Sequence, residues 1–499
     1  MEVSVSLPAS EILRKENEDI MAPRERKVIG SSTSSASDDD DDNNNLQQRG
    51  KTQVFHTPDG APYIICDSSD AFVNPTTPPH KTPEQINQEL NLDLGQNWIK
   101  RDNTTLLSCL KVIDMIFVQW WEVYFFVFWN MVPLSIRRAL TFGGWKIFLF
   151  LHRHTLGRRT GLHPSQSEEY HAFTTLAWWS RFFVISPRRI RFSLGQMPAV
   201  TPNVVEESRL ETISETLEIP NVPDKQKDHC TVKGLFVHHP EDDLHSDHLI
   251  FWVYGGAYLG GDVPGNASAA DYFARQCKCD VFIPEFRLAP EYDADDVMWD
   301  VLLAYKWICS SRQRDPSKVF ILGLSSGGAI CVRLMQYIAE YQRNEDLLQP
   351  YMERVLNDDS VKMPKGAILF GPYLDYTVEK KGSFLHYARH DLIVTEAVQD
   401  YGLPYLEKFI PKGKRREYSP VYRSMEGLAP ICMHISEHES VYDSCISLTN
   451  QARAQGVQVT LGVWKYMCHV FTFLNAFVPE GQVSMNIACD WIRKKSKEN

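Results

Sequence analysis

Three features are missing from this sequence of 499 residues, and each absence argues against a class of protein. Residues 1–15 mix polar and charged side chains without an apolar stretch, so we expect no secretory signal peptide. Basic residues are not in excess, because the formal net charge is -11. A nucleic-acid-binding surface must displace counterions from phosphates with basic groups, so we expect no nucleic-acid partner.

Regular cysteine spacing is the third missing feature. The 11 cysteines are odd in number and scattered from Cys66 to Cys489, unlike the disulfide framework of a small secreted domain. Cys277 and Cys279 form a C-x-C pair, but no second Cys or His pair stands at zinc-ligand spacing, so we expect no metal site. We therefore expect a protein that is cytoplasmic or membrane-associated, with the endoplasmic reticulum as one candidate membrane, and not clearly secreted.

The chain divides by composition into three expected regions. Residues 1–90 include a Ser/Thr-rich stretch at 31–37 and an acidic run at 38–42, which predict a disordered, low-complexity tail. Residues 91–210 are rich in aromatic and basic side chains and are expected to be helical. Residues 211–499 alternate short apolar runs with longer helical segments, which is typical of an α/β protein with a mostly parallel central sheet flanked by helices.

The aromatic and basic region allows two interpretations. The stretch 106–151 contains Trp120, Trp121 and Trp129, but Asp114 and Glu122 interrupt it, so it is a poor match to a membrane-spanning helix. Basic residues follow among the aromatic ones: Arg137, Arg138, Lys146, Arg153, Arg158 and Arg159. The region is therefore expected either to lie on an anionic membrane surface, as an anchor, or to form a helical cap over the third region.

The third region predicts seven strands, at 234–238, 249–254, 281–286, 318–324, 367–370, 431–435 and 457–464. Helices are expected at 267–276, 295–310, 327–341, 440–454 and 470–494. Because parallel strands alternate with helices, the loops that follow the strands meet at one edge of the sheet, where such folds bind their ligands.

Residues 323–327 read G-x-S-x-G between a predicted strand and a predicted helix. This context is typical of a nucleophile elbow, in which a serine occupies a strained turn and the flanking glycines avoid clashes. We therefore expect Ser325 to be a catalytic nucleophile. A serine hydroxyl needs a base to remove its proton and donors to stabilise the oxyanion that forms.

Both requirements have candidates in the sequence. Gly255 and Gly256 directly follow a predicted strand, so their N–H groups, with that of Ser326, are expected to form an oxyanion hole. His469 follows the last predicted strand and is the candidate base, because α/β-hydrolases present their triads in the order Ser, acid, His. Glu439 is the favoured acid and Asp443 the alternative, since both follow the strand at 431–435.

From about residue 212 to 495 the sequence resembles the hormone-sensitive lipase branch of the α/β-hydrolases, which also contains the arylacetamide deacetylases. The resemblance rests on four motifs in order: Tyr-Gly-Gly-Ala-Tyr at 254–258, Arg-Leu-Ala-Pro-Glu at 287–291, the elbow, and 464–471 around His469. It implies the α/β-hydrolase fold and a carboxylester hydrolase that acts on small-molecule esters or lipids through an acyl-enzyme, without metal or cofactor. A helical cap is implied at 156–198, with a further piece at 376–410.

The chain departs from the family pattern at three places. Tyr254 replaces a histidine that braces the oxyanion loop, Leu324 and Ser326 stand where Asp and Ala are common, and Glu439 stands where an aspartate is usual. Two alternatives to an esterase follow. One is a non-catalytic, ligand-binding or receptor-like protein on the same fold, and the other is a membrane-surface scaffold.

Overall fold

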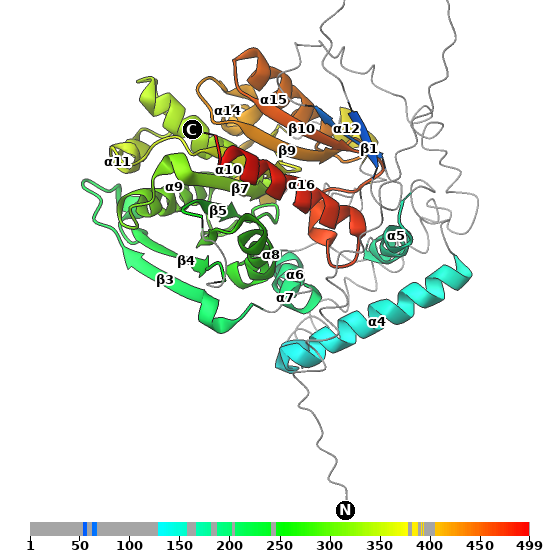
Figure 1. The fold of residues 1–499 in the computed structure, drawn as a ribbon. Helices are drawn as coiled ribbons and strands as arrows, with labels where there is room; N and C mark the ends of the chain where they lie inside the picture. The colour runs from blue at the N-terminus through cyan, green and yellow to red at the C-terminus, as the bar shows by residue number, and fades with distance from the viewer. Residues whose placement is uncertain are drawn as a thin grey trace, which may run out of the picture. The chain divides into compact units, whose positions relative to one another are not determined.

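The computed structural model describes the chain at residues 53–56, 62–66, 128–156, 166–180, 187–201, 205–240, 246–377, 382–387, 391, 393 and 405–498. All of these residues belong to one compact unit, which spans residues 48–499. Within this unit the described strands form a single sheet that is covered by helices (Figure 1).

Ten strands of the described residues form the sheet, in the order β1-β2-β10-β9-β8-β7-β5-β6-β4-β3. Their bounds are β1 Gln53–His56, β2 Pro62–Cys66, β3 Leu210–Thr216, β4 Thr231–Val237, β5 Leu249–Val253, β6 Asp280–Glu285, β7 Val319–Leu324, β8 Gly366–Phe370, β9 Ile431–Ser436 and β10 Val459–Trp464. The central strands, from β10 to β6, are parallel to their neighbours. The outer strands pair antiparallel. The expected mostly parallel central sheet is thus confirmed.

The α-helices of the described residues are α4 Leu134–Thr155, α5 Glu168–Ser180, α6 Pro187–Gly195, α7 Met197–Val200, α8 Val263–Cys277, α9 Ala294–Ser310, α10 Ser326–Gln342, α11 Glu353–Leu356, α12 Gly382–His386, α14 Arg415–Tyr418, α15 Tyr442–Ala454 and α16 Pro479–Lys495. Short 3-10 helices are η3 Glu207–Arg209, η4 Asp224–Gln226, η5 Pro316–Lys318, η6 Pro350–Met352, η7 Lys412–Lys414, η8 Pro420–Tyr422 and η9 Phe471–Leu474. No helix of these residues combines the length and apolar character that a bilayer crossing requires.

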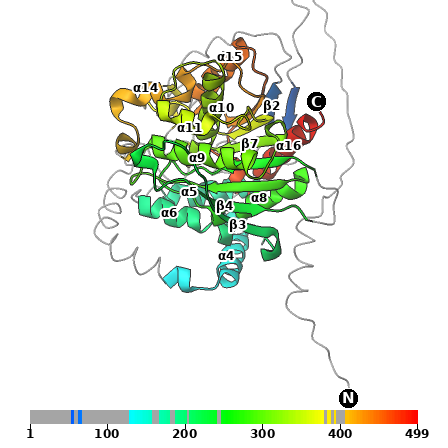
Figure 2. The ribbon, with the colours of Figure 1, turned by 90° about the vertical axis from the view of Figure 1, so that its left-hand side faces the viewer.

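The strand order reverses direction next to β5 and β7. From β5 the chain crosses through α8 to β6 on one side, and it then returns through α9 past β5 to β7. Because parallel crossovers are right-handed, α8 lies on the opposite face from α9 and α10. α8 packs against α16, and α9 packs against α10 (Figure 2). Open α/β sheets bind ligands where the order reverses, so the ends of β5 and β7 mark the expected site.

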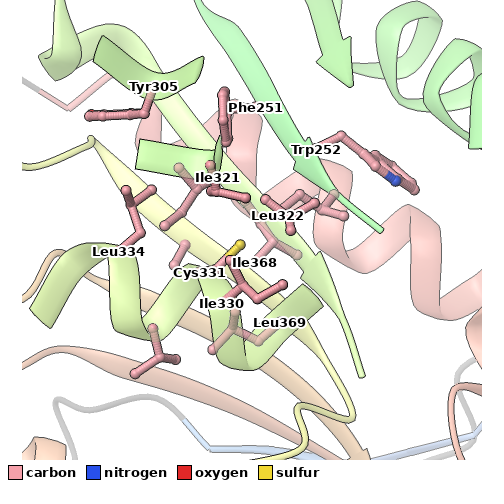
Figure 3. Close-up of a cluster of buried hydrophobic side chains, with 14 of the residues drawn as sticks. Phe251, Trp252, Tyr305, Ile321, Leu322, Ile330, Cys331, Leu334, Ile368 and Leu369 are labelled. Carbon is pink, nitrogen blue, oxygen red and sulfur yellow. The ribbon is translucent and has the colours of Figure 1, made fainter. Parts of the chain in front are cut away.

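The core surrounds these two strands. Every residue of β5 and β7 is buried, because helices cover both faces of the central sheet. Figure 3 shows Ile321 and Leu322 of β7 between side chains of β5, β8 and α10, including Phe251, Ile368 and Ile330. This packing holds the strand that leads to Ser325 in a fixed position.

Several expected boundaries are wrong. The helix expected at 470–494 is two elements, η9 and α16, because Pro479 stands in the first turn of α16 and cannot continue a preceding helix. Strand β3 was not expected, since it is an edge strand with one buried residue in seven. Residues 53–56 and 62–66 are strands, so the expected disordered tail does not run unbroken to residue 90.

Candidate active site

Ser325 occupies a strained backbone turn between β7 and α10. Its φ of 49° and ψ of -117° lie in a region that side chains other than glycine rarely adopt. The turn is held from both sides, because Ser325 N–H donates to Phe370 O at 2.9 Å and Tyr373 N–H donates to Ser325 O at 2.9 Å. This geometry is that of the expected nucleophile elbow.

Glycines make the strained turn sterically feasible. A Cβ atom at Gly327 would lie 2.2 Å from Val253 O and 2.4 Å from Tyr254 O. At Gly323, a Cβ atom would lie 2.6 Å from Gly327 O. The first turn of α10 therefore approaches the end of β5 as closely as backbone allows, which brings Ser325 next to the glycine loop.

His469 lies between Ser325 and Glu439 in a continuous chain of hydrogen bonds. Ser325 Oγ lies 2.8 Å from His469 Nε2, and His469 Nδ1 lies 2.7 Å from Glu439 Oε2. The carboxylate can only accept, so Nδ1 carries the proton and Nε2 is left to accept from the serine hydroxyl. Glu439 Oε1 in turn accepts from Ser436 N–H at 2.8 Å, which orients the carboxylate.

The two acid candidates have different partners. Asp443 lies in the first turn of α15 and accepts from Ser383 N–H of α12 at 2.8 Å, whereas Glu439 contacts His469. The structure therefore brings Ser325, His469 and Glu439 together and places Asp443 as a brace between two helices. The longer side chain of Glu439 reaches His469 Nδ1 without difficulty.

Burial and charge set the protonation behaviour of the pair. Burial lowers the pKa of His469, but the hydrogen bond from its ring to Glu439 and the negative charge of that carboxylate raise it, and the net direction is upward. Burial raises the pKa of Glu439, and the contact with His469 opposes that rise. An imidazolium that forms here would be stabilised by a carboxylate in a dry environment.

The glycine loop after β5 lies against Ser325. A Cβ atom at Gly255 would lie 3.2 Å from Ser325 Cβ, and Gly256 has a φ of 135°. No hydrogen bond joins the N–H group of Gly255 or Gly256 to any other described residue. Ser326 begins α10, so its N–H group is one of the unpaired donors at a helix N-terminus. The three N–H groups that the sequence predicts for an oxyanion hole are thus without a hydrogen-bond partner among the described residues.

Tyr254 takes over the bracing role of the usual histidine. Its ring stacks on Phe286 with centroids 4.1 Å apart, and its hydroxyl accepts from Phe286 N–H at 3.4 Å. A Cβ atom at Gly261 would lie 2.6 Å from the Tyr254 ring. The loop is thus clamped by an aromatic side chain instead of an imidazole.

Helix α6, from the segment that the sequence predicted as a cap, lies on the same loop. Arg191 Nε donates to Leu259 O at 2.8 Å, and its guanidinium also donates to Ala289 O at 2.7 Å and pairs with Glu291. Of the second cap piece at 376–410 only a part lies within the described residues. Its Phe409 stacks on Tyr258 at 4.3 Å, directly after the glycine loop.

Two residues near the triad were not expected from the sequence. Gly371 follows β8, and a Cβ atom there would lie 2.9 Å from Glu439 Oε2 and 3.1 Å from His469 Nδ1. Asp391 is fully buried and accepts from His469 N–H at 3.2 Å and from Ser440 N–H at 3.1 Å. Its carboxylate therefore ties His469 to Ser440, the residue that follows Glu439. A Gly-Pro pair after a strand signals Gly371, but no local pattern signals Asp391.

The comparisons with known proteins agree with this geometry. Residues 250–473 match a family described as alpha/beta hydrolase fold. This part of the chain has the α/β-hydrolase fold. The crystal structure of EstE5-PMSF superposes with a TM-score of 0.50 at 20% identity and covers 65% of this chain and 98% of its own. The resemblance that the four motifs indicate is confirmed.

Two curated relatives of the α/β-hydrolase extend the comparison. An acetyl-hydrolase of Streptomyces hygroscopicus is 21% identical over 323 residues, which are 65% of this chain and 94% of the relative. An esterase of Acinetobacter venetianus is 25% identical over 240 residues, which are 48% of this chain and 72% of the relative. Both matches cover most of the relative, so the similarity extends well beyond the elbow.

The first prediction concerns the glycines of the elbow. Gly327→Ala forces a Cβ atom onto two carbonyl oxygens, and we expect it to lower the free energy of unfolding by more than about 2 kcal/mol. Gly413→Ala is the matched control, because no atom lies within 4 Å of the Cβ position there. Thermal unfolding measures both. Equal melting temperatures for the two variants would contradict the close approach of α10 and β5.

The second prediction separates Glu439 from Asp443. His469 must be neutral to act as a base, so activity falls as the pH falls through its pKa, which lies above the ordinary value of about 6.5. Glu439→Gln removes the charge that raises this pKa. We expect the midpoint of the acid limb of kcat/KM to move to lower pH and kcat to fall by about 10³- to 10⁴-fold.

Asp443→Asn is the control for this prediction, because the Asp443 carboxylate contacts Ser383 and not the imidazole. Its midpoint should match that of the unaltered protein. A pH profile that shifts in Asp443→Asn and stays fixed in Glu439→Gln would reverse the assignment.

The third prediction concerns Asp391, which we expect to act as a positioning residue. In Asp391→Asn the amide cannot accept from both N–H groups, and the negative charge that raises the pKa of His469 is lost. We expect a lower kcat with little change in KM, and an acid limb displaced to lower pH. In Asp375→Asn, whose carboxylate accepts from Thr377 and Tyr422, neither change is expected. An unaltered pH profile in Asp391→Asn would show that the residue only supports the fold.

Proposed function

We propose that this protein is a serine carboxylesterase that hydrolyses apolar esters through an acyl-enzyme intermediate. The observation that carries the proposal is the chain of hydrogen bonds from Ser325 through His469 to Glu439, beside three amides available to an oxyanion. The names of the relatives support the substrate class, since they include an acetyl-hydrolase, an esterase and an ethyl acetate hydrolase.

Acylation begins when Ser325 Oγ attacks the carbonyl carbon of the ester and His469 Nε2 accepts the hydroxyl proton. Negative charge develops on the carbonyl oxygen, and the N–H groups of Gly255, Gly256 and Ser326 would stabilise it. Glu439 stabilises the imidazolium in its reactive orientation. The tetrahedral intermediate then collapses, and His469 returns the proton to the departing alcohol oxygen.

Deacylation repeats these steps with water as the nucleophile. His469 takes a proton from water, the hydroxide attacks the acyl carbon, and the same amides hold the second oxyanion. The imidazolium protonates Ser325 Oγ as the acid product leaves, which restores the starting state. None of these steps uses a group outside the chain and its substrate.

Aromatic side chains beside the reacting groups support an apolar ester. Tyr258 follows the oxyanion loop, stacks on Phe409 and meets Tyr376 edge-on at 5.9 Å. Tyr373, which binds the backbone of Ser325, lies 5.7 Å from Tyr376. These rings supply apolar surface next to the nucleophile. A receptor-like protein on this fold would not require the complete hydrogen-bond chain, so the catalytic function is favoured.

The fourth prediction tests the reaction. The protein should hydrolyse p-nitrophenyl butyrate with a burst of p-nitrophenol when acylation outpaces deacylation, and Ser325→Ala should lower the rate by at least about 10⁴-fold. Ser317→Ala is the matched control, because Ser317 is exposed at η5, and it should keep the full rate. Unaltered protein that neither hydrolyses short esters nor longer acyl esters would refute the proposal.

A further inference from the structure

Helix α4 exposes an apolar face. Leu140, Ile147 and Phe150 are 56%, 64% and 62% exposed. With Ile136 and Leu151, which are also exposed, they recur at spacings of three, four and seven residues, so they share one side of the helix. A helix of a globular domain normally turns such a side toward the core. An apolar face that is exposed instead indicates a surface that binds another molecule or a membrane.

The opposite face of α4 is already occupied by the hydrolase domain. Phe142 and Trp145 contact Phe477, with ring centroids 5.6 and 5.2 Å apart. His152 is buried and lies 3.0 Å from the Thr175 hydroxyl of α5. These contacts fix the rotation of the helix, which runs beside α5 (Figure 1). The exposed face is therefore a stable feature of the surface.

The charges on α4 all have one sign. Residues 134–155 contain Arg137, Arg138, Lys146 and Arg153 and no Asp or Glu, in a chain whose net charge is -11. Lys146 and Arg153 flank the apolar face along one side, where Arg153 also pairs with Glu168 of α5, and Arg137 lies on the other side. An apolar stripe bordered by basic groups is complementary to a bilayer of anionic lipid, where the stripe enters the acyl boundary and the bases meet the headgroups.

We propose that α4 lies in the plane of an anionic lipid bilayer with its apolar face inserted at the headgroup boundary. This rests on the proposed esterase function, for which the substrate is then an ester that partitions into that bilayer. The two interpretations of the region at 91–210, a helical cap and a membrane-surface anchor, are then compatible. One face of α4 packs on the domain, and the opposite face binds the membrane.

Contacts connect the docking helix to the catalytic loop. Arg137 donates to the Oε1 atom of Gln196, between α6 and α7, at 2.7 Å, and Arg138 donates to Pro198 O of α7 at 2.8 Å. α6 in turn lies on the glycine loop through Arg191. The helix that would bind the bilayer is thus linked, through α7 and α6, to the loop that carries the Gly255 and Gly256 amides.

The fifth prediction is tested by flotation of the full-length protein with vesicles. With phosphatidylcholine vesicles that contain phosphatidylserine, the protein should float, and Ile147→Glu should weaken binding on the order of tenfold to a hundredfold. Lys146→Gln should weaken it about fivefold. Leu385→Glu is the matched control, since it places the same charge at an exposed apolar residue of α12, and it should float like the unaltered protein.

Activity measurements separate this inference from the proposed function. Ser325→Ala should float normally while it fails to hydrolyse esters, and Ile147→Glu should keep its rate on soluble p-nitrophenyl butyrate and lose rate on an ester embedded in the vesicles. Failure of the unaltered protein to float, or equal flotation with pure phosphatidylcholine, would overturn the inference. It would also be overturned by a dimer in sedimentation experiments that Ile147→Glu dissociates, since the face would then belong to a second copy.

Discussion

The hydrogen bond from Ser325 Oγ to His469 Nε2 joins residues that are 144 positions apart, and the remainder of the site depends on it. The two residues follow β7 and β10, which are separated in the sheet by β8 and β9. Three strand spacings amount to about 14 Å, so the loop after β10 must extend across the sheet edge to reach the serine. The geometry of the site therefore depends on contacts that hold the loop after β10 in an extended position.

The intervening strands supply what holds that loop. The loop after β9 contributes Glu439, which binds the imidazole, and the last residue of β9, Ser436, donates its hydroxyl to Met467 O at 2.7 Å. The loop after β8 contributes Gly371, whose missing side chain leaves room for the carboxylate and the ring. Asp391 binds the backbone of His469 from a third direction. Each group is buried, so these hydrogen bonds form in a low dielectric, which strengthens them. A buried polar group that lost its partner there would destabilise the fold. The same contacts that fold the sheet edge thus orient the base.

Most of this arrangement could be predicted from the sequence where the signal is local. The central strands are continuous apolar runs because helices cover both of their faces, and the elbow and glycine loop carry residues that only a tight turn requires. Elements at the edges were missed because their pattern is weak: β3 faces solvent along most of its length. The helix expected at 470–494 is too long. Apolar residues recur at helical spacing on both sides of the break before Pro479, so the sequence pattern does not reveal that break.

Residues whose role arises from distant contacts could not be predicted. Asp391 is a single carboxylate in a segment without periodicity, and only the fold brings it to His469. The choice between Glu439 and Asp443 was open for the same reason, since spacing alone does not say which carboxylate faces the ring. The face of α4 that packs on the domain likewise depends on Phe477, which lies far along the chain. Local chemistry identifies such residues as candidates, and the tertiary structure decides among them.

The central claim is that folding activates one serine hydroxyl out of all those in the chain. Peptide mapping by mass spectrometry after treatment with a fluorophosphonate tests it most directly. The account predicts a single phosphonylated residue, Ser325, with labelling that slows as the pH falls through the pKa of His469. Labelling at another serine, or no adduct on a protein that still hydrolyses esters, would contradict it.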